Sequence, residues 1–144
     1  MNWRNYLDDP ALRDFTAAET GRWRLLVRRG VDARPLVRAA EEGDGDGGTV
    51  AGGRAEHPVV AMGEGQSAVV RRYRRGGMMR HVNAERYFRG HRALEELRVT
   101  ETARQHGVVV PEVLAAGERR NGIGDVALFA TGVFTGAAGL EQVR

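Results

Sequence analysis

An arginine on a predicted strand, followed by a helix rich in glutamate, carries the chemistry of this sequence. Val69 and Arg71 lie two residues apart in the segment 67–73, so strand geometry places their side chains on the same face. A guanidinium binds a carboxylate or a phosphate through two parallel hydrogen bonds. The helix that follows offers three carboxylates, those of Glu95, Glu96 and Glu101. These residues alone favour a structural ion pair between strand and helix, and an anion-binding arginine held by a glutamate is the alternative.

A pair of glycines, Gly52 and Gly53, comes just before the strand that leads to this arginine. Glycine lets the backbone approach a phosphate closely and turn its amide groups toward it. We interpret the pair as a candidate phosphate-covering turn. The alternative is that both glycines belong to a flexible linker, 42–53, that is rich in glycine and acidic residues.

Two strands and a helix are expected to position these residues. The segments 58–62 and 67–73 are apolar and β-branched, and with the turn Gly63-Glu64-Gly65 between them they predict a hairpin. Helical spacing begins at about Asn83, and the positions Leu94, Leu97, Thr100 and Ala103 predict a helix of about four turns. Gly107 supplies its C-terminal stop.

The end of the chain predicts two more extended segments, 108–113 and 126–131, and a further helix over 132–140. The order hairpin, helix, strand, strand contains no βαβ unit. We therefore expect an α+β fold in which a small antiparallel sheet carries one packed helix.

The first 49 residues are expected to form a short α/β N-terminal extension, and residues 50–144 the main unit. Residues 1–20 favour a short polar helix interrupted at Pro10. Residues 22–28 favour a strand, and residues 32–41 favour a short helix with Asp32 as its N-cap.

Composition narrows the class of protein. A length of 144 residues, 42% hydrophobic residues and a net charge of +3 indicate a soluble, globular domain. The sequence has no cysteine, and its four histidines lack metal-ligand spacing, so we predict no disulfide and no metal site. It also lacks an apolar run of about 18 residues and a basic, apolar leader, so we expect a cytoplasmic protein.

Four motifs occur in a fixed order from residue 69 to residue 117. They are VVRRYRRGG, ERYFRG, RALEELR and GVVVPEVLAAG. With these motifs, the sequence over about residues 50–144 resembles the Kdo kinase and lipopolysaccharide core kinase family, whose members have a protein-kinase-like fold.

The resemblance implies the nucleotide-binding N-terminal lobe of an ATP-dependent carbohydrate kinase that acts on the Kdo/heptose inner core of lipopolysaccharide. Val69 would then cover the adenine, Arg71 would contact the phosphates and Glu96 would hold Arg71. The segment Phe129 to Thr131 would be the hinge whose backbone meets the adenine. The implied cofactor is ATP with Mg²⁺, and its metal ligands would come from a second lobe. No catalytic loop or metal-binding motif follows these segments, so we expect no catalytic residue in this chain and no activity from it alone.

Two other readings remain open. The chain could be a degenerate kinase-lobe module that binds a partner without catalysis, or an arginine-rich RNA-binding domain. The arginine cluster at 71–75 is by default a solvated edge, and a surface that faces the acidic substrate or the inner membrane comes second. The cluster contains one aromatic residue, Tyr73, and the net charge of the chain is small. Nucleic acid is therefore the least favoured partner. The expected partners are a nucleotide and a lipopolysaccharide core precursor, and peripheral association with the inner face of the inner membrane is a further option.

Overall fold

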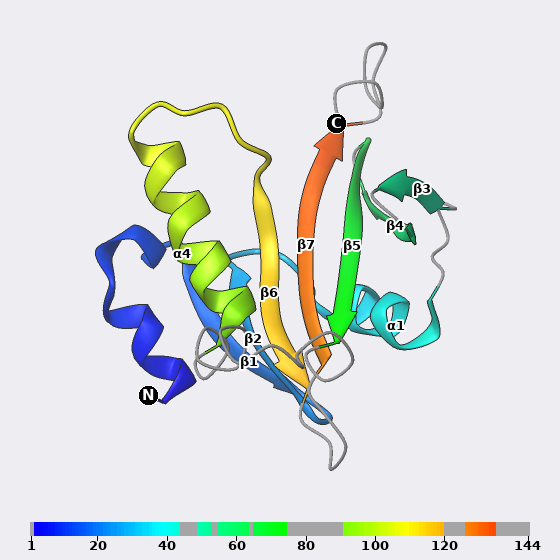
Figure 1. Cartoon of the computed structure of the whole chain (residues 1–144), viewed down its shortest axis with the longest axis horizontal. Helices are drawn as coiled ribbons and strands as arrows, with labels where there is room; N and C mark the ends of the chain where they lie inside the picture. Colours follow the sequence, from blue (N-terminus) through cyan, green and yellow to red (C-terminus); the bar gives the residue numbers. More distant parts are fainter. Residues whose placement is uncertain are drawn as a thin grey trace, which may run out of the picture.

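The computed structural model describes residues 2–43, 49–52, 55–63, 65–74, 91–119 and 126–134. These residues form two short 3-10 helices, two α-helices and seven strands (Figure 1). In chain order the elements are η1 (Trp3–Asp8), η2 (Pro10–Leu12), β1 (Phe15–Thr20), β2 (Trp23–Arg28), α1 (Arg34–Glu42), β3 (Thr49–Gly52), β4 (Ala55–Gly63), β5 (Gln66–Arg74), α4 (Arg92–Gln105), β6 (Val113–Arg119) and β7 (Val126–Phe134).

The strands lie in the order β1-β2-β6-β7-β5-β4-β3, and each neighbouring pair is antiparallel. The predicted hairpin is therefore confirmed as β4 and β5, with Val59 opposite Val69. β7 lies between β5 and β6, so that Phe129 is opposite Arg71 on one side and Ala116 on the other. The α+β class and the small antiparallel sheet are as predicted.

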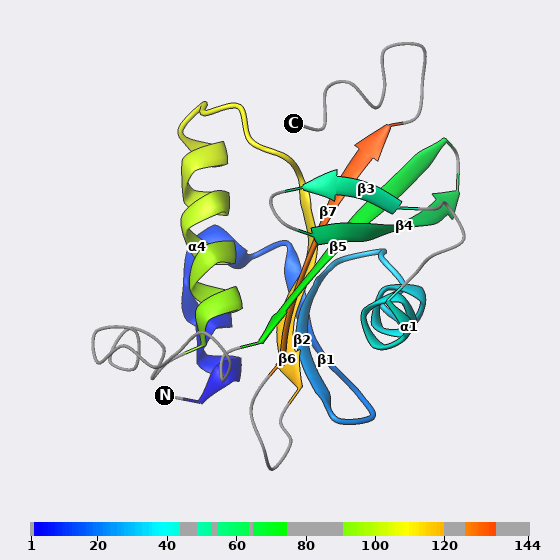
Figure 2. The ribbon, with the colours of Figure 1, turned by 45° about the vertical axis from the view of Figure 1, so that its right-hand side comes forward.

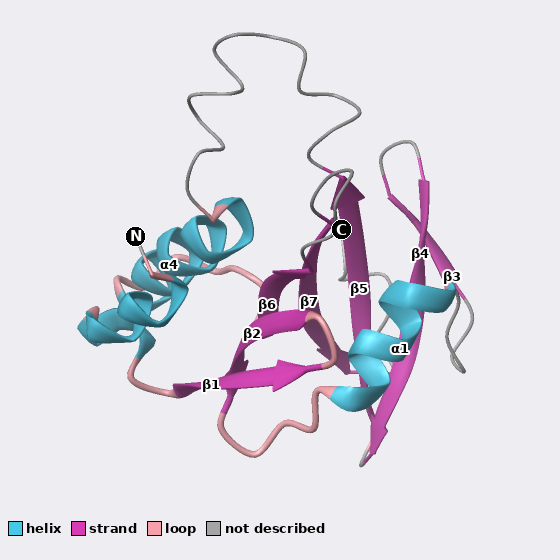
Figure 3. Ribbon diagram, turned by 90° about the horizontal axis from the view of Figure 1, so that it is seen from below, coloured by secondary structure: helices cyan, strands magenta, loops and turns pink. Residues whose placement is uncertain are grey.

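Helices cover both faces of the sheet, α4 on one face and α1 on the other (Figure 3). The strand residues alternate between two apolar cores because successive side chains point to opposite faces. In β7, Leu128 and Ala130 join the core beneath α1, whereas Ala127 and Phe129 join the core beneath α4. The predicted helix on the sheet is α4, and the second face is closed by a helix of the N-terminal extension.

Helix α4 has the length and the end that the sequence predicts. It runs for 14 residues from Arg92 to Gln105, and Gly107 follows it with a φ of 89°, a conformation that glycine adopts without strain. The buried side chains of the helix are Ala93, Leu94, Leu97 and Glu101. The predicted start near Asn83 lies outside the described residues.

The N-terminal region departs from its prediction at residues 15–20. These residues form strand β1 instead of part of a helix, and Phe15 pairs with Arg28 while Thr20 pairs with Trp23. Alanine and glutamate in this segment favour a helix locally, but pairing along β2 overrides that preference because strand propensity depends strongly on context. Residues 23–28 form the expected strand, and β2 pairs in turn with β6, so the extension contributes strands to the same sheet.

Three smaller differences concern the predicted linker, the N-cap of α1 and the helix predicted at the end of the chain. Residues 49–52 form strand β3, which pairs with β4, although they were interpreted as part of a flexible connection. Asp32 lies before α1 and accepts a hydrogen bond from the backbone N–H of Arg34 at 3.0 Å, while the N-cap position is Ala33. The helix predicted over 132–140 is wrong for residues 132–134, which end β7; the rest of it lies outside the described residues.

Candidate functional site

Arg71 and Glu96 form an ion pair between the middle of β5 and the first half of α4. The Nη2 atom of Arg71 lies 2.7 Å from Oε2 of Glu96. Both side chains are partly accessible, with exposed fractions of 40% and 35%. A guanidinium carries five N–H donors. It can therefore contact a carboxylate and a phosphate through different nitrogen atoms, as an arginine at a phosphate site does.

The ring of Phe129 lies beneath the same guanidinium. The central guanidinium carbon of Arg71 is 4.9 Å from the ring centroid, a distance at which the negative face of the ring attracts a cation. Phe129 is opposite Arg71 in the sheet and is only 3% exposed, so its ring is held by the core. Glu96 and Phe129 together fix the position of the cation from two sides.

Arg72 shows that the alternation predicted for this strand holds. Its Nη1 atom donates to the backbone oxygen of Ala40 in α1 at 3.0 Å, on the opposite face of the sheet from Arg71. The adjacent residues Arg71 and Arg72 of β5 therefore lie on opposite faces of the sheet, and of these two only Arg71 belongs to the candidate site.

Val69 and Thr131 lie next to this group in the sheet. Val69 is 6% exposed and is opposite the half-buried Thr131. This pair is two cross-strand pairs along from Arg71 and Phe129, and so lies on the same face of the sheet. Residues 129–131 pair with β5 on one side and with β6 on the other. Their backbone groups therefore take part in the sheet, and the backbone contact to adenine expected from this segment stays a prediction. The side chains of Phe129 and Thr131 lie on the same face of the sheet as those of Arg71 and Val69.

The candidate glycine turn falls at the connection between β3 and β4. Gly52 is the last residue of β3 and is opposite Ala55, the first residue of β4. Gly53 lies outside the described residues.

The three glutamates of α4 have different partners, which the sequence alone did not assign. Glu95 accepts a hydrogen bond from the hydroxyl of Tyr6 at 2.7 Å, and Glu101 accepts one from Nη2 of Arg28 at 2.9 Å. The pKa of the Glu95 carboxyl is lowered, mainly because of the bond from Tyr6. Burial acts in the opposite direction, and the bond from Arg98 adds a smaller lowering effect. Only Glu96 is therefore paired with the arginine of β5.

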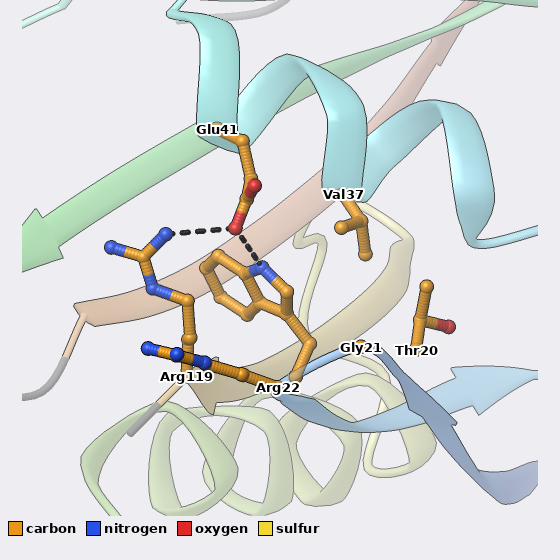
Figure 4. Close-up of a pocket in the computed structure, with 7 residues that line it drawn as sticks. Thr20, Gly21, Arg22, Val37, Glu41 and Arg119 are labelled. Carbon is orange, nitrogen blue, oxygen red and sulfur yellow. Dashed lines mark hydrogen bonds and ion pairs between the residues drawn. The ribbon is translucent and has the colours of Figure 1, made fainter. Parts of the chain in front are cut away.

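A pocket of about 430 Å³ lies away from this group, between α1 and the turn that joins β1 to β2 (Figure 4). Glu41 points into it and accepts hydrogen bonds from Nε1 of Trp23 at 2.9 Å and from Nη1 of Arg119 at 2.7 Å. None of the site residues predicted from the sequence lines this pocket. Its lining residues are Thr20, Gly21, Arg22, Trp23, Val37, Glu41 and Arg119.

Metal clusters and membrane-spanning helices are both absent from the described part of the chain. No group of three or more histidine, aspartate or glutamate residues there is arranged to hold a metal ion. Among the helices of the same residues, none has the length and apolar character needed to cross a membrane.

Comparison with known proteins identifies the family of the chain. The model of the lipopolysaccharide kinase (Kdo/WaaP) family matches residues 37–144, more than half of the chain. Two curated relatives, both named 3-deoxy-D-manno-octulosonic acid kinase and both from strains of Xylella fastidiosa, are 37% identical over 84 residues. The match covers 49% of this chain and 34% of each relative, so the chain spans only about a third of their length. No solved structure matches the chain. On the family match, the chain belongs to the lipopolysaccharide kinase (Kdo/WaaP) family.

Proposed function

We propose that this chain forms the nucleotide-binding lobe of an ATP-dependent kinase that phosphorylates the Kdo/heptose inner core of lipopolysaccharide. The observation that carries the proposal is the Arg71 guanidinium, which lies between the carboxylate of Glu96 and the ring of Phe129. Family membership and the names of the two relatives support the activity and the substrate class.

In this proposal Arg71 neutralises charge on the nucleotide phosphates, and Glu96 keeps the guanidinium on the α4 face of the sheet. A cation held by a helix glutamate is the arrangement that protein kinases require for phosphoryl transfer. Val69 and Thr131 form the next cross-strand pair on the same face as the arginine and would line the same site. ATP would supply the phosphoryl group, and the ligands for Mg²⁺ would have to come from outside the described residues.

A nucleotide titration tests the role of Arg71. The chain, its Arg71→Ala variant and an Arg72→Ala control would be titrated with Mg·ATP and followed by NMR, which detects weak binding. Loss of a charge-assisted hydrogen bond costs about 1.5–3 kcal/mol, so Arg71→Ala should weaken binding at least about tenfold. Arg72→Ala removes the same charge from the opposite face and should bind like the parent. Equal affinity of the parent and the Arg71 variant would overturn the assigned role.

The substrate requires a separate assay. In a protein that joins this lobe to the second lobe expected for the family, phosphate from ATP should be transferred to an acceptor that carries Kdo or heptose, and Arg71→Ala should lower the rate. Nucleotide binding without transfer to either sugar would leave the lobe assignment intact and refute the substrate assignment.

A further inference from the structure

A segment at the N-terminus packs against the side of α4 (Figure 2). Trp3, Tyr6 and Leu12 of η1 and η2 have exposed fractions of 6%, 5% and 0%. They share one apolar core with Leu94 and Leu97 of α4. These N-terminal residues precede residue 37, where the match to the family model begins.

Two polar contacts tie the same segment to opposite ends of α4. In the first turn, the hydroxyl of Tyr6 donates to Oε2 of Glu95 at 2.7 Å. In the last turn, Nε2 of Gln105 donates to the backbone oxygen of Ala11 at 2.9 Å. The helix is therefore held at two points about three turns apart, which restricts both its tilt and its rotation.

Tyr6 also contacts the residue from which α4 begins. Its ring meets the ring of His91 edge to face, with 6.0 Å between the centroids. Nδ1 of His91 lies 2.5 Å from Oε1 of the buried Glu118 in β6. The start of α4 is thus fixed between the N-terminal segment and the sheet.

The position of α4 decides whether Glu96 reaches Arg71. Glu95, which is bound by Tyr6, is the neighbour of Glu96 in a rigid helix. The bond between Glu96 and Arg71 is 2.7 Å long, and a side-chain hydrogen bond is lost by about 3.6 Å. A movement of the helix by roughly 1 Å is therefore enough to break it unless the side chains adjust.

We propose that residues 3–12 form an intramolecular clamp on α4, in which Tyr6 is a positioning residue for the pair of Glu96 and Arg71. The inference rests on the proposed nucleotide-binding role of that pair. The clamp acts on nucleotide binding through Arg71, whereas a segment that only covers apolar surface contributes to stability and does not act through Arg71.

The test uses a variant that keeps the apolar contacts of the clamp and removes its polar ties, Tyr6→Phe combined with Gln105→Ala. Arg4→Gln is the matched control within the same segment. The Arg4 side chain lies over the ring of Trp3 and bonds to the exposed Glu19 of β1, and it is neither of the two polar ties to α4. With Arg71 present, the double variant should bind Mg·ATP about fivefold more weakly, and Arg4→Gln should bind normally. In an Arg71→Ala background, the double variant should cause less than about a twofold further change.

A second measurement needs no nucleotide. Because the chain has no cysteine, Ala61→Cys in β4 and Val99→Cys on the exposed side of α4 can carry two spin labels whose separation is measured directly. The distribution of distances should be narrow in the parent and in Arg4→Gln, and broader in Tyr6→Phe/Gln105→Ala. An unchanged distribution, or an equal loss of affinity with and without Arg71, would overturn the clamp. If Arg71→Ala itself leaves nucleotide affinity unchanged, the proposed function fails, and the distance measurement alone decides whether the clamp exists.

Discussion

Replacement of Arg28 tests how α4 is attached to the sheet. Glu101 is fully buried in α4, and its carboxylate accepts hydrogen bonds from Arg28 of β2 and from Arg104 of the same helix, each at 2.9 Å. The Arg28 side chain is only 12% exposed, whereas that of Arg104 is 38% exposed. Arg28 also donates from Nε to the backbone oxygen of Val113 at 2.9 Å and lies over the ring of Phe15.

These contacts determine how much each replacement should lower the free energy of unfolding. Breaking a buried ion pair by removal of one partner costs about 3–5 kcal/mol, because a charge stays buried without compensation. Arg104 still compensates part of the Glu101 charge, so Arg28→Ala should lower the free energy of unfolding by about 3 kcal/mol. Arg104→Ala leaves the buried pair with Arg28 intact and should cost about 1 kcal/mol or less.

The assay is urea denaturation of the parent and both variants, with the slopes compared to confirm the same two-state transition. Glu101→Gln, combined with Arg28→Ala, provides the decisive control. If the cost comes from the uncompensated carboxylate, removal of its charge should restore part of the lost stability. Equal losses for Arg28→Ala and Arg104→Ala, or no recovery on addition of Glu101→Gln, would refute the reasoning.

Two further predictions concern other parts of the sheet. The bonds from Trp23 and Arg119 lower the pKa of the Glu41 carboxyl, so their contribution to stability is present above about pH 4.5 and is lost as the pH falls through the lower folded-state pKa. Glu41→Gln should therefore lose less stability than the parent between about pH 5 and pH 3 in an acid denaturation series. A Cβ atom at Gly117 would lie 2.1 Å from the backbone oxygen of Arg24. Gly117→Ala should thus lower the free energy of unfolding by about 3 kcal/mol, measured in urea, and a cost below about 0.5 kcal/mol would contradict this close approach.

The local sequence pattern was sufficient to predict the central elements of the fold. The hairpin of β4 and β5 and the helix α4 were predictable because strand alternation, helical spacing and a stop at Gly107 agree with the final structure. The same alternation placed Arg71 and Arg72 on opposite faces of β5. A resemblance to a known family was needed to choose Glu96 among the three glutamates.

Residues whose structure depends on distant partners could not be predicted in this way. β1 is a strand because it pairs with β2, and its own composition favours a helix. The ring of Phe129 lies beneath Arg71 because of the register between β5 and β7, which a single sequence does not reveal. The contact of Tyr6 with Glu95 joins residues that are 89 positions apart, and no local signal marks Tyr6 as a neighbour of the site.

The three glutamates of α4 explain why rotation of this helix matters to the site. Successive residues of an α-helix are turned by about 100°, so Glu95, Glu96 and Glu101 point in three different directions. Each direction meets a different element: the N-terminal segment, β5 and β2. Because Glu95 and Glu101 bind their partners only in one rotational setting, they fix the setting in which Glu96 reaches Arg71. A glutamate moved from position 96 to a neighbouring position would point about 100° away and would not replace it, although the composition of the helix would be unchanged.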